Sequence, residues 1–572
     1  MDKNKRLAVW LPVIIACSIA LGVFVGNSYN FQYQGKNRPI TSNNKINAIL
    51  DIIDEQYVDT VNMNQLIEGT IPKIFSELDP HSVYISAEDA SMVNEELEGS
   101  FSGIGVSFNM QTDTILIISV ISGGPAEKAG LQPFDRIITI NDSIYTGKKT
   151  SQEKVIKTLR GAKNSTVRLG VKRNNEPDLL YFDVTRGDVP VHTVDAAYAV
   201  DNGIGYIKVS KFARTTYNEF ITAIAKLKQA GCESFIIDLR NNTGGYMDAA
   251  NNMINEFMPE GRLIVYTEGK SFPRADIYAN GTGTCKENPI VVLTDEISAS
   301  ASEIFSGAIQ DNDRGLIIGR RTYGKGLVQT QIAMSDGSAL RLTIARYYTP
   351  SGRCIQKPYV KGQPKEYEMD LITRYERGEF FSQDSIHQTG EEYKTSIGRI
   401  VYGGGGIMPD YFVAEDTTAL TPYYTECVTQ GTIAQYCFEY TDDNREKLST
   451  FDNAAELEKY LRRQGLVDHF IRYADSKGIQ RRNNMILKSQ HLFEQAIYGS
   501  IIYNILEMND YIQYLNRNDI TLEKAIQLFK AGQTKPTLHD QKGNSGKNSG
   551  KKKAAYHRAT PIIQPKHQGC IA

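Results

Sequence analysis

The chain has 572 residues, too many for one hydrophobic core, and at about 150 residues per domain this predicts roughly three or four domains. Hydrophobic residues make up 41% and charged residues 23%, and the formal net charge of -2 gives no reason to expect nucleic acid as a partner. The seven cysteines include no CxxC pair, so we expect no metal site and no cofactor. Cys427 and Cys437 are expected to be buried free thiols, or a disulfide in an oxidising compartment.

The N-terminus has the pattern of a membrane segment. Lys3, Lys5 and Arg6 precede an uncharged run, residues 7–25, that is long enough to cross a hydrocarbon core of ~30 Å. We expect residues 1–26 to form an uncleaved anchor, with the rest of the chain outside the cytoplasm. A cleaved signal peptide and lipidation at Cys17 are the alternatives.

Residues 27–98 read as a polar linker followed by helices. Residues 27–43 are rich in Asn and Gln, and the apolar spacing from about residue 46 to 98 is helical. The motif Leu-Asp-Pro-His-Ser (78–82) ends one helix, because proline lacks an amide hydrogen and disfavours helix before it. Ser86 resembles the first residue of a capping box that opens the next helix.

The alternating sequence pattern within residues 99–188 predicts short strands at 104–109, 114–120, 166–173 and 179–185. Residues 189–415 predict strands at 205–209, 234–239, 290–295 and 316–319, with helices at 217–229 and 247–257. The almost continuously apolar segments 235–238 and 290–293 are typical of buried parallel strands, so this part is predicted to be α/β. Residues 416–540 are mostly helical, for example at 457–463 and 486–508. Residues 541–572, with Gly, Asn, Ser and Lys repeats, are expected to be disordered.

One segment, residues 294–304, combines the end of an apolar strand, a turn of small residues and an apparent helix at 303–311. A nucleophilic serine in such a turn is accessible to a peptide, and free amides at the helix start can donate to an oxyanion. Each serine here is also a candidate helix cap. We expect Ser298 and Ser302 to be structural and Ser300 to be the nucleophile.

A nucleophilic serine needs a base. His192 and His387 are the nearest histidines in sequence and lack a recognisable carboxylate motif, although triads assemble in space. Lys325 lies between two glycines, which would let the backbone pack closely and bury the amine, lowering its pKa towards that of a base. Gln329 is a neutral partner for that amine. A Gly-Lys loop that binds phosphate is the alternative, but the P-loop pattern is absent.

A third segment, Ile-Asp-Leu-Arg-Asn-Asn-Thr-Gly-Gly (237–245), is a strand followed by a polar turn with paired glycines. Such a strand-turn-helix can present backbone amides to an anion. Alone it is a common α/β turn, but with the other two segments it predicts a further donor for an oxyanion hole.

Together, Ser-Ala-Ser-Ala-Ser-Glu-Ile, Tyr-Gly-Lys-Gly-Leu-Val-Gln and the 237–245 segment resemble the C-terminal processing peptidases, which are tail-specific serine proteases. The resemblance covers roughly residues 45–415 and includes the segments 78–82 and 403–410. It implies Ser300 as nucleophile, Lys325 as general base and Gln329 as its orienting partner. It implies an oxyanion hole from the amides of Ala301 and one of the paired glycines, for which we take Gly245.

Residues 99–188 resemble the PDZ domain of these proteases. Gly103, Ile104 and Gly105 match the loop that captures a C-terminal carboxylate, beside a strand edge that a ligand can extend. Gly-Gly-Pro-Ala-Glu-Lys-Ala-Gly-Leu (123–131) and Asp-Arg-Ile-Ile-Thr-Ile-Asn (135–141) match the family's helix and turn. In related proteases this domain can move to block or open the active site, and such motion in this chain is a hypothesis.

The expected fold is therefore α/β and multidomain: a helical N-terminal region, a PDZ domain, an α/β protease core of the ClpP/crotonase type (189–415) and a helical extension.

The expected function is a serine endopeptidase of the cell envelope, in the periplasm or otherwise outside the cytoplasm, that binds proteins with free C-termini and cuts near them. A catalytically silent PDZ scaffold that docks envelope proteins is the alternative. A third hypothesis is a protease that regulates cell-wall hydrolases. Assembly into a homo-oligomer stays open.

Overall fold

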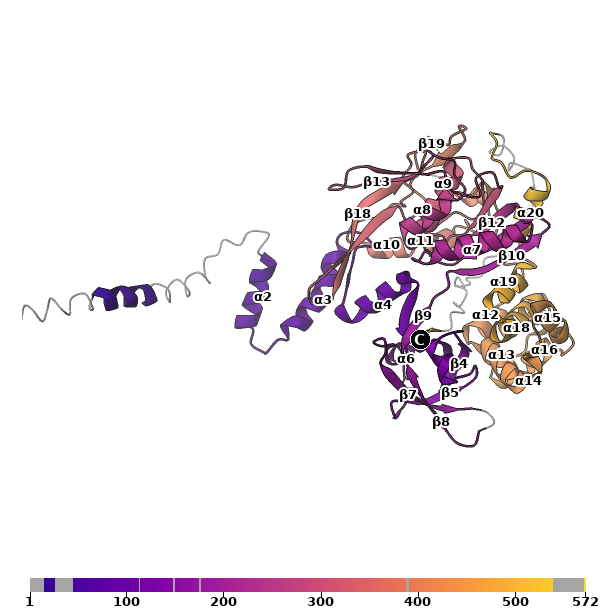
Figure 1. Ribbon diagram of the computed structural model, residues 1–572, viewed down its shortest axis with the longest axis horizontal. Coiled ribbons are helices and arrows are strands. Elements are labelled where there is room, and N and C mark those ends of the chain that lie inside the picture. The colour runs from indigo at the N-terminus through magenta and orange to yellow at the C-terminus, as the bar shows by residue number, and fades with distance from the viewer. Residues whose placement is uncertain are drawn as a thin grey trace, which may run out of the picture. The chain divides into compact units, whose positions relative to one another are not determined.

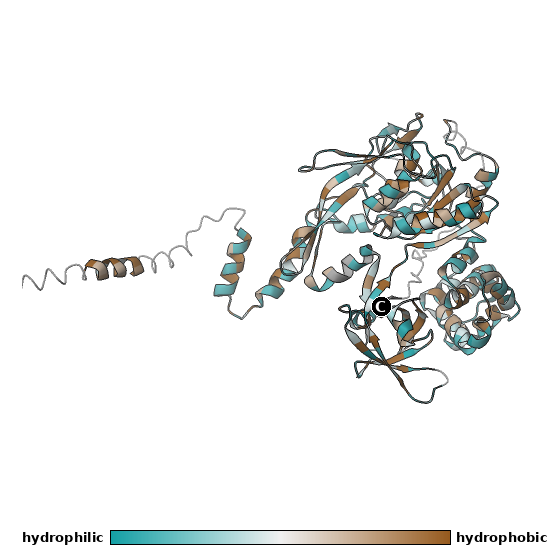
Figure 2. Cartoon of the chain, viewed as in Figure 1, coloured by the Kyte–Doolittle hydropathy of each residue, from teal (hydrophilic) through white to brown (hydrophobic). Residues whose placement is uncertain are grey.

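The computed structural model describes residues 15–25, 45–112, 114–147, 150–173, 176–386, 390–538 and 570–571 (Figure 1). The chain divides into Met1–Ile74 and Phe75–Ala572. The first part contains a helix at residues 15–25, coloured as hydrophobic in Figure 2, then α2 (Lys45–Gln56) and most of α3 (Met63–Ser76). The predicted anchor and linker lie largely outside the described residues. Of the helices that are described, none combines the length and the apolar character of a membrane span.

The lead-in of the second part contains β1 (Val83–Ile85) and α4 (Ala87–Glu98). The Ser86 side chain accepts a hydrogen bond from the Asp89 amide, which confirms the predicted cap of this helix. The helix end predicted at Leu-Asp-Pro-His-Ser is confirmed as well, since α3 ends at Ser76. The sequence did not predict β1.

A β-rich domain follows, with two short helices. Its sheet has the order β22-β3-β4-β5-β7-β8, with β6 on β5, while β2 pairs with β9. The predicted strands at 114–120, 166–173 and 179–185 are confirmed, but the prediction at 104–109 was wrong for Ile104 and Gly105, which form a loop. The elements are β2 (Ser100–Gly103), β3 (Val106–Thr112), β4 (Thr114–Val120), α5 (Pro125–Ala129), β5 (Arg136–Ile140), β6 (Ser143–Ile144), α6 (Gln152–Leu159), β7 (Thr166–Lys172), β8 (Leu180–Thr185), β9 (Gly187–Pro190) and β22 (Cys570–Ile571).

The α/β core is built on a sheet with the order β10-β11-β12-β15-β16-β21, parallel from β11 onwards. Side chains of one face, such as Ile237 and Val292, pack with α7, α8 and α9, and those of the other, such as Ile236 and Val291, pack with α20. Burial on both faces explains the apolar strands and confirms the α/β prediction. The elements are β10 (Val194–Asp201), β11 (Ile204–Val209), α7 (Thr216–Gln229), β12 (Ser234–Asp238), α8 (Met247–Asn255), β15 (Ile290–Thr294), α9 (Ala301–Asp311), β16 (Leu316–Gly319) and β21 (Tyr411–Phe412).

A second sheet, which the sequence did not predict, has the order β1-β18-β13-β14, with β17 on β18. Its strands mix polar and apolar side chains and carry no long apolar run. They are β13 (Leu263–Glu268), β14 (Ala275–Tyr278), β17 (Leu327–Ala333) and β18 (Ala339–Tyr348), and after them come α10 (Pro364–Glu368), α11 (Asp370–Glu376), the 3-10 helix η1 (Gln383–Ser385), β19 (Glu392–Lys394) and β20 (Ile400–Tyr402).

The C-terminal region is helical, as predicted, around a core that includes Phe470 and Phe493. The single helix predicted at 486–508 was wrong, because α17, α18 and α19 are separate. Cys427 and Cys437 are buried free thiols. The helices are α12 (Pro422–Thr429), α13 (Thr432–Asp443), α14 (Arg445–Leu448), α15 (Ala454–Arg462), α16 (Leu466–Ser476), α17 (Asn483–Lys488), α18 (Gln490–Ile505), α19 (Met508–Asn516) and α20 (Ile520–Lys530).

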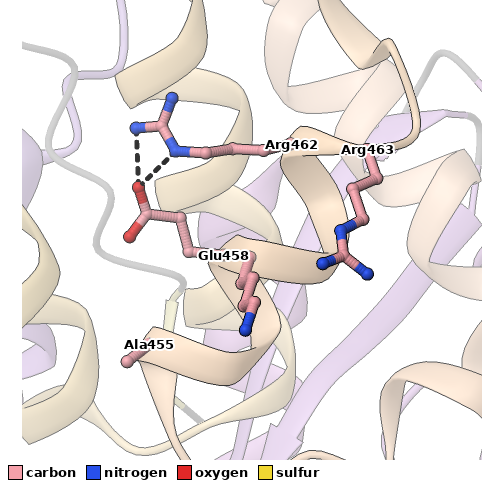
Figure 3. A pocket seen from close by; sticks show the side chains of 5 residues that line it. Ala455, Glu458, Arg462 and Arg463 are labelled. Carbon is pink, nitrogen blue, oxygen red and sulfur yellow. Dashed lines mark hydrogen bonds and ion pairs between the residues drawn. The ribbon is translucent and has the colours of Figure 1, made fainter.

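A shallow pocket lies on α15 of this helical region (Figure 3). Its lining includes Lys459, Arg462 and Arg463, and Arg462 forms an ion pair of 2.7 Å with Glu458. None of the residues that the sequence predicts for catalysis lines it, so it is separate from the candidate active site.

Candidate active site

Ser300 lies in the turn between β15 and α9, immediately before the first residue of the helix. Its backbone has φ 56 and ψ -113, a conformation that non-glycine residues rarely adopt. Strained backbone of this kind is found at functional sites, and a sharp strand-to-helix turn presents the nucleophile in other hydrolases. Ser300 is half-buried, and its neighbours in the sequence, Ala299 and Ala301, have small side chains.

The serines on either side are buried and structural, as the sequence predicts. The Ser298 hydroxyl donates to the Leu239 carbonyl at 2.8 Å, and the Ser302 hydroxyl donates to the Asn242 carbonyl at 2.9 Å. Both bonds tie the serine turn to the loop after β12. Of the three alternating serines, Ser300 is the one whose side chain is not used in this way.

Lys325 lies in the loop between β16 and β17, and its neighbours are packed as the sequence predicts. A Cβ on Gly326 would lie 2.8 Å from the Gln356 amide nitrogen, and one on Gly324 (φ 90) would lie 3.1 Å from Lys357 Cβ. Only glycine fits at such distances. Burial, reinforced by the charge of Arg341, lowers the pKa of Lys325 below its usual value, against the opposing charges of Glu303 and Asp79. Among the described residues its amine has no ion-pair or hydrogen-bond partner.

Glu303 joins the serine turn to the lysine loop. Its Oε2 accepts from the Ser300 amide at 2.9 Å and from the Lys325 amide at 2.8 Å, and its Oε1 accepts from Gly324 and Thr322. The side chain is fully buried. Burial raises the pKa of Glu303 to about 7, although these four donors favour the ionised form. Sequence reasoning missed this residue, and its capping-box spacing from Ser300 was the available signal.

Tyr347 of β18 makes a second connection between the same two residues. Its hydroxyl lies 3.2 Å from the Ser300 carbonyl oxygen and 2.8 Å from the Lys325 carbonyl oxygen. Ser300 and Lys325 are therefore held at both their amides and their carbonyls by shared partners. The sequence contained no signal for Tyr347.

Gln329 lies on β17 and is held by a chain of hydrogen bonds. Its Nε2 donates to Thr343 Oγ1 at 3.3 Å, and Thr343 Oγ1 donates to Asp79 Oδ1 at 3.0 Å. Asp79 also accepts from the amides of His81 and Ser82. The predicted motif at 78–82 thus bonds to β18, the strand paired with the one that carries Gln329. With its Nε2 engaged, the Gln329 carbonyl oxygen is left to accept.

The paired glycines face the serine turn. A Cβ on Gly244 (φ 101) would lie 2.7 Å from Ser300 Cβ and 3.0 Å from the Ala301 amide nitrogen, so the two loops are in direct contact. The Gly244 amide donates to Asn242 Oδ1 at 2.9 Å. Within the described part of the chain, by contrast, no group accepts from the amides of Gly245 and Ala301. These two amides are the pair that the sequence predicts for an oxyanion hole.

The histidines take other positions. His192 is exposed, and His387 lies outside the described residues. His81, which the sequence offered only as part of a motif, interacts electrostatically with Lys325 and has its Nε2 2.9 Å from the Tyr367 hydroxyl. Burial, together with the charge of Lys325, lowers the pKa of His81 to about 4, so this imidazole is neutral at neutral pH.

Gly103, Ile104 and Gly105 lie between β2 and β3. Gly103 ends β2, and Gly105 has φ 80, in the left-handed region that favours glycine. The Ile104 and Gly105 carbonyls accept from Ala126 and Ile121, whereas no described group accepts from the Ile104 and Gly105 amides. Two unused amides at the start of a strand are what a carboxylate requires.

The described residues contain no group of three or more His, Cys, Asp or Glu side chains that could hold a metal ion. At the candidate site the structure brings together a serine hydroxyl, a lysine amine of lowered pKa and backbone amides.

Comparison with protein families gives four matches along the chain. Residues 203–364 match peptidase family S41, and residues 102–184 match the PDZ domain. Residues 26–89 match the N-terminal domain of the activating protease CtpB, and residues 423–507 match a family of unknown function, DUF8443.

Two curated relatives come from Bacillus subtilis (strain 168). Its carboxy-terminal processing protease CtpB is 34% identical over 316 residues, which are 55% of this chain and 65% of CtpB. Its carboxy-terminal processing protease CtpA is 32% identical over 392 residues, which are 68% of this chain and 82% of CtpA. This chain thus spans just under two thirds of CtpB and more than two thirds of CtpA. Among solved structures, the photosystem II D1 C-terminal processing protease is 28% identical to this chain, with a TM-score of 0.31. The match covers 55% of this chain and 89% of that protease.

Proposed function

Because this chain belongs to the carboxy-terminal processing proteases of peptidase family S41, which are serine-type peptidases, we propose that Ser300 and Lys325 form the dyad with which it cuts proteins near their C-termini. In this proposal the PDZ domain captures the substrate's C-terminus, and the cleaved bond lies upstream of it. The physiological substrate class is then unstructured protein tails outside the cytoplasm.

The proposed reaction uses groups that the chain supplies. Ser300 Oγ attacks the peptide carbonyl carbon while the neutral Lys325 amine takes its proton. The amides of Ala301 and Gly245 donate to the oxyanion of the tetrahedral intermediate. As the C–N bond breaks, the lysine ammonium returns the proton to the leaving amine. Water, deprotonated by the same lysine, then releases the acyl group from Ser300, and Gln329 orients the amine throughout.

The observation that carries this proposal is the double connection between the two residues. Glu303 Oε2 accepts from both amides, and the Tyr347 hydroxyl contacts both carbonyls. A nucleophile and a base must be held in fixed geometry, since small displacements of reacting groups are costly. The lowered pKa of Lys325 supports the same roles, because only the neutral amine can accept a proton.

The proposed location rests on the N-terminal sequence. The apolar run 7–25 follows basic residues, and the described residues of it, 15–25, form a helix whose large side chains are exposed, such as Leu21 and Phe24. Exposed apolar side chains on a helix suit insertion into a lipid layer. We propose that this segment anchors the protein with the protease outside the cytoplasm. Protease digestion of spheroplasts, in which the outer face of the cytoplasmic membrane is accessible, checks this: a domain outside the cytoplasm is degraded, whereas a cytoplasmic one survives.

The test of the dyad is cleavage of an unstructured protein with an apolar C-terminus by Ser300→Ala and Lys325→Ala. Each change is expected to lower kcat/KM by at least about 10³-fold. Matched controls are Ser271→Ala and Lys270→Ala, which alter exposed residues of the β13–β14 loop. Cleavage retained by either dyad variant, with normal thermal unfolding, would rule out the assignment. A wild-type chain that cuts nothing but binds the substrate would instead be the PDZ scaffold.

A further inference from the structure

The PDZ domain holds a strand that comes from the far end of the same chain. β22 (Cys570–Ile571) pairs antiparallel with β3, with Ile571 opposite Ser107 and Cys570 opposite Phe108. The other side of β3 is occupied by β4, so β22 covers the outer edge of the sheet. The edge of a sheet presents unpaired amides and carbonyls, and an added strand satisfies them.

The direction of the strand matters as much as its position. Residue 571 lies nearer the start of β3 than residue 570 does, so the tail runs towards the loop that contains Ile104 and Gly105. That loop has the two unused amides described above. A substrate C-terminus that extends β3 and places its carboxylate at these amides would run in the same direction. The tail and the substrate therefore need the same edge.

The sequence of the tail fits such a role. Residues 551–553 are lysines and most of the following residues are polar or proline, whereas residues 570–572 are Cys-Ile-Ala. Isoleucine favours strands. Residues 539–569 connect Leu538 to β22, and fully extended at about 3.4 Å each they would reach roughly 100 Å. A ligand tethered to the same chain competes at an effective concentration that can reach about 1 mM.

We propose that residues 570–571 are an internal ligand of β3 that competes with substrate C-termini for the PDZ edge. The proposal rests on the proposed function in one respect, namely that β3 and the Ile104–Gly105 loop receive the substrate. A substrate then binds only when the tail has left, so its apparent association constant is the intrinsic one multiplied by the fraction of molecules whose edge is free.

The first experiment locates the tail without using substrate. In the full chain carrying Ser300→Ala and Cys570→Ser, Ser107→Cys and Ile571→Cys place two thiols at opposed positions, whose Cα separation in an antiparallel pair suits a disulfide. The control combines Ile571→Cys with Tyr181→Cys, which is 54% exposed and lies on β8, the opposite edge of the sheet. Mild oxidation in dilute solution is expected to cross-link the first pair within one chain at least about tenfold faster. Equal rates, or cross-links only between two chains, would overturn the proposal.

The second experiment measures competition. The probe is a fluorescent peptide with the sequence of residues 563–572, and its Kd is measured by anisotropy on the full chain carrying Ser300→Ala. Adding Ile571→Pro removes an amide hydrogen from the paired segment, and Kd is expected to fall about tenfold. Ala555→Pro, the same change elsewhere in the tail, is expected to leave Kd unaltered. A Kd that is the same in all three proteins would overturn the proposal.

The outcomes also separate this proposal from the proposed function. A probe that binds all three proteins equally leaves the PDZ domain as a C-terminus receptor and overturns only the internal competition. A probe that binds none of them overturns the competition and the role of the PDZ domain in substrate capture. The catalytic dyad is judged by neither result, because its test is the cleavage assay with Ser300→Ala and Lys325→Ala.

Discussion

The amides of Ser300 and Lys325 donate to the same oxygen atom, Oε2 of Glu303, at 2.9 and 2.8 Å. The two residues belong to different loops, after β15 and after β16, and the shared acceptor fixes the distance between those loops. The Tyr347 hydroxyl repeats the connection at their carbonyls. The relative position of Ser300 and Lys325 therefore depends on two side chains to which the proposed reaction gives no chemical role.

Replacing Glu303 by glutamine tests this dependence. The amide NH₂ cannot accept, so at least two of the four donors lose their partner, each at a cost of about 1–3 kcal/mol. The Glu303→Gln variant is expected to lose about 2–4 kcal/mol of unfolding free energy and at least about 10²-fold in kcat/KM. Chemical denaturation and cleavage kinetics measure both. Glu260→Gln, an exposed control, is expected to alter neither, and wild-type kcat/KM in folded Glu303→Gln would refute the dependence.

The pH dependence of kcat/KM should follow the titration of Lys325. Its pKa lies below 10.5 because the amine is buried, and the base is its neutral form, so kcat/KM is expected to rise as pH increases through that pKa. If Gln329 orients the amine as proposed, Gln329→Glu adds a negative charge beside it and favours the ammonium, moving the rise to higher pH by about one unit or more. Profiles of wild type, Gln329→Glu and the remote control Gln229→Glu provide the comparison. An unmoved rise in Gln329→Glu would contradict the pairing of Gln329 with a titrating Lys325.

His81 should make folding sensitive to acid. Its pKa falls from 6.5 to about 4 on folding, because of burial and the nearby Lys325. Between these two values the unfolded chain binds a proton that the folded chain does not, so stability is lost as pH falls from 6.5 towards 4, by up to about 3 kcal/mol. His81→Gln is expected to lose less stability over this range, and His192→Gln, at an exposed histidine, to behave as wild type. Denaturation at several pH values measures the difference, and identical losses in all three proteins would contradict it.

Gly244 should tolerate no side chain. A Cβ there would lie 2.7 Å from Ser300 Cβ, so Gly244→Ala is expected to displace the nucleophile and lower kcat/KM at least about 10²-fold. Gly261→Ala is the matched control, because Gly261 also has a positive φ (78) but has nothing within 4 Å of its added Cβ. It should cost about 1 kcal/mol of stability and leave cleavage unchanged. Equal activity of the two variants would mean that the contact with Ser300 is unimportant.

The substrate's carboxylate should matter for binding more than for chemistry. If the Ile104 and Gly105 amides receive it, a substrate whose C-terminus is amidated is expected to show a KM about tenfold higher with kcat little changed. Steady-state kinetics with the paired substrates measures this. The same KM for both would remove the carboxylate from substrate recognition.

The sequence predicted the parts of the fold that are locally distinctive. Continuous apolar runs identified β12 and β15, and the 294–304, 321–329 and 237–245 segments identified the loops that meet at Ser300. The sheet of β13, β14, β17 and β18 escaped prediction because its strands are partly exposed and mix polar with apolar residues. The alternation Leu-Arg-Leu-Thr-Ile at residues 340–344 is typical of a half-buried strand and was the available signal for β18.

The site residues that the sequence did not predict are defined by contacts between segments far apart in the chain. Glu303 follows Ser300 at capping-box spacing, but its bonds to Gly324 and Lys325 join segments that meet only in the folded chain. Tyr347 and Thr343 lie on a strand that was not predicted, so their contacts had no basis in the sequence. The assignment of Gln329 remains a prediction, as do those of Gly245 and Ala301.

The central claim, that Ser300 is the nucleophile and Lys325 its base, is tested most directly by finding the acyl group. The full chain is mixed with an ester substrate, quenched in acid and digested, and fragment mass spectra locate the acylated serine. We predict an acyl group on Ser300 in wild type, none in Ser300→Ala and far less in Lys325→Ala. An acyl group on Ser298 or Ser302, or full acylation of Ser300 without Lys325, would contradict it.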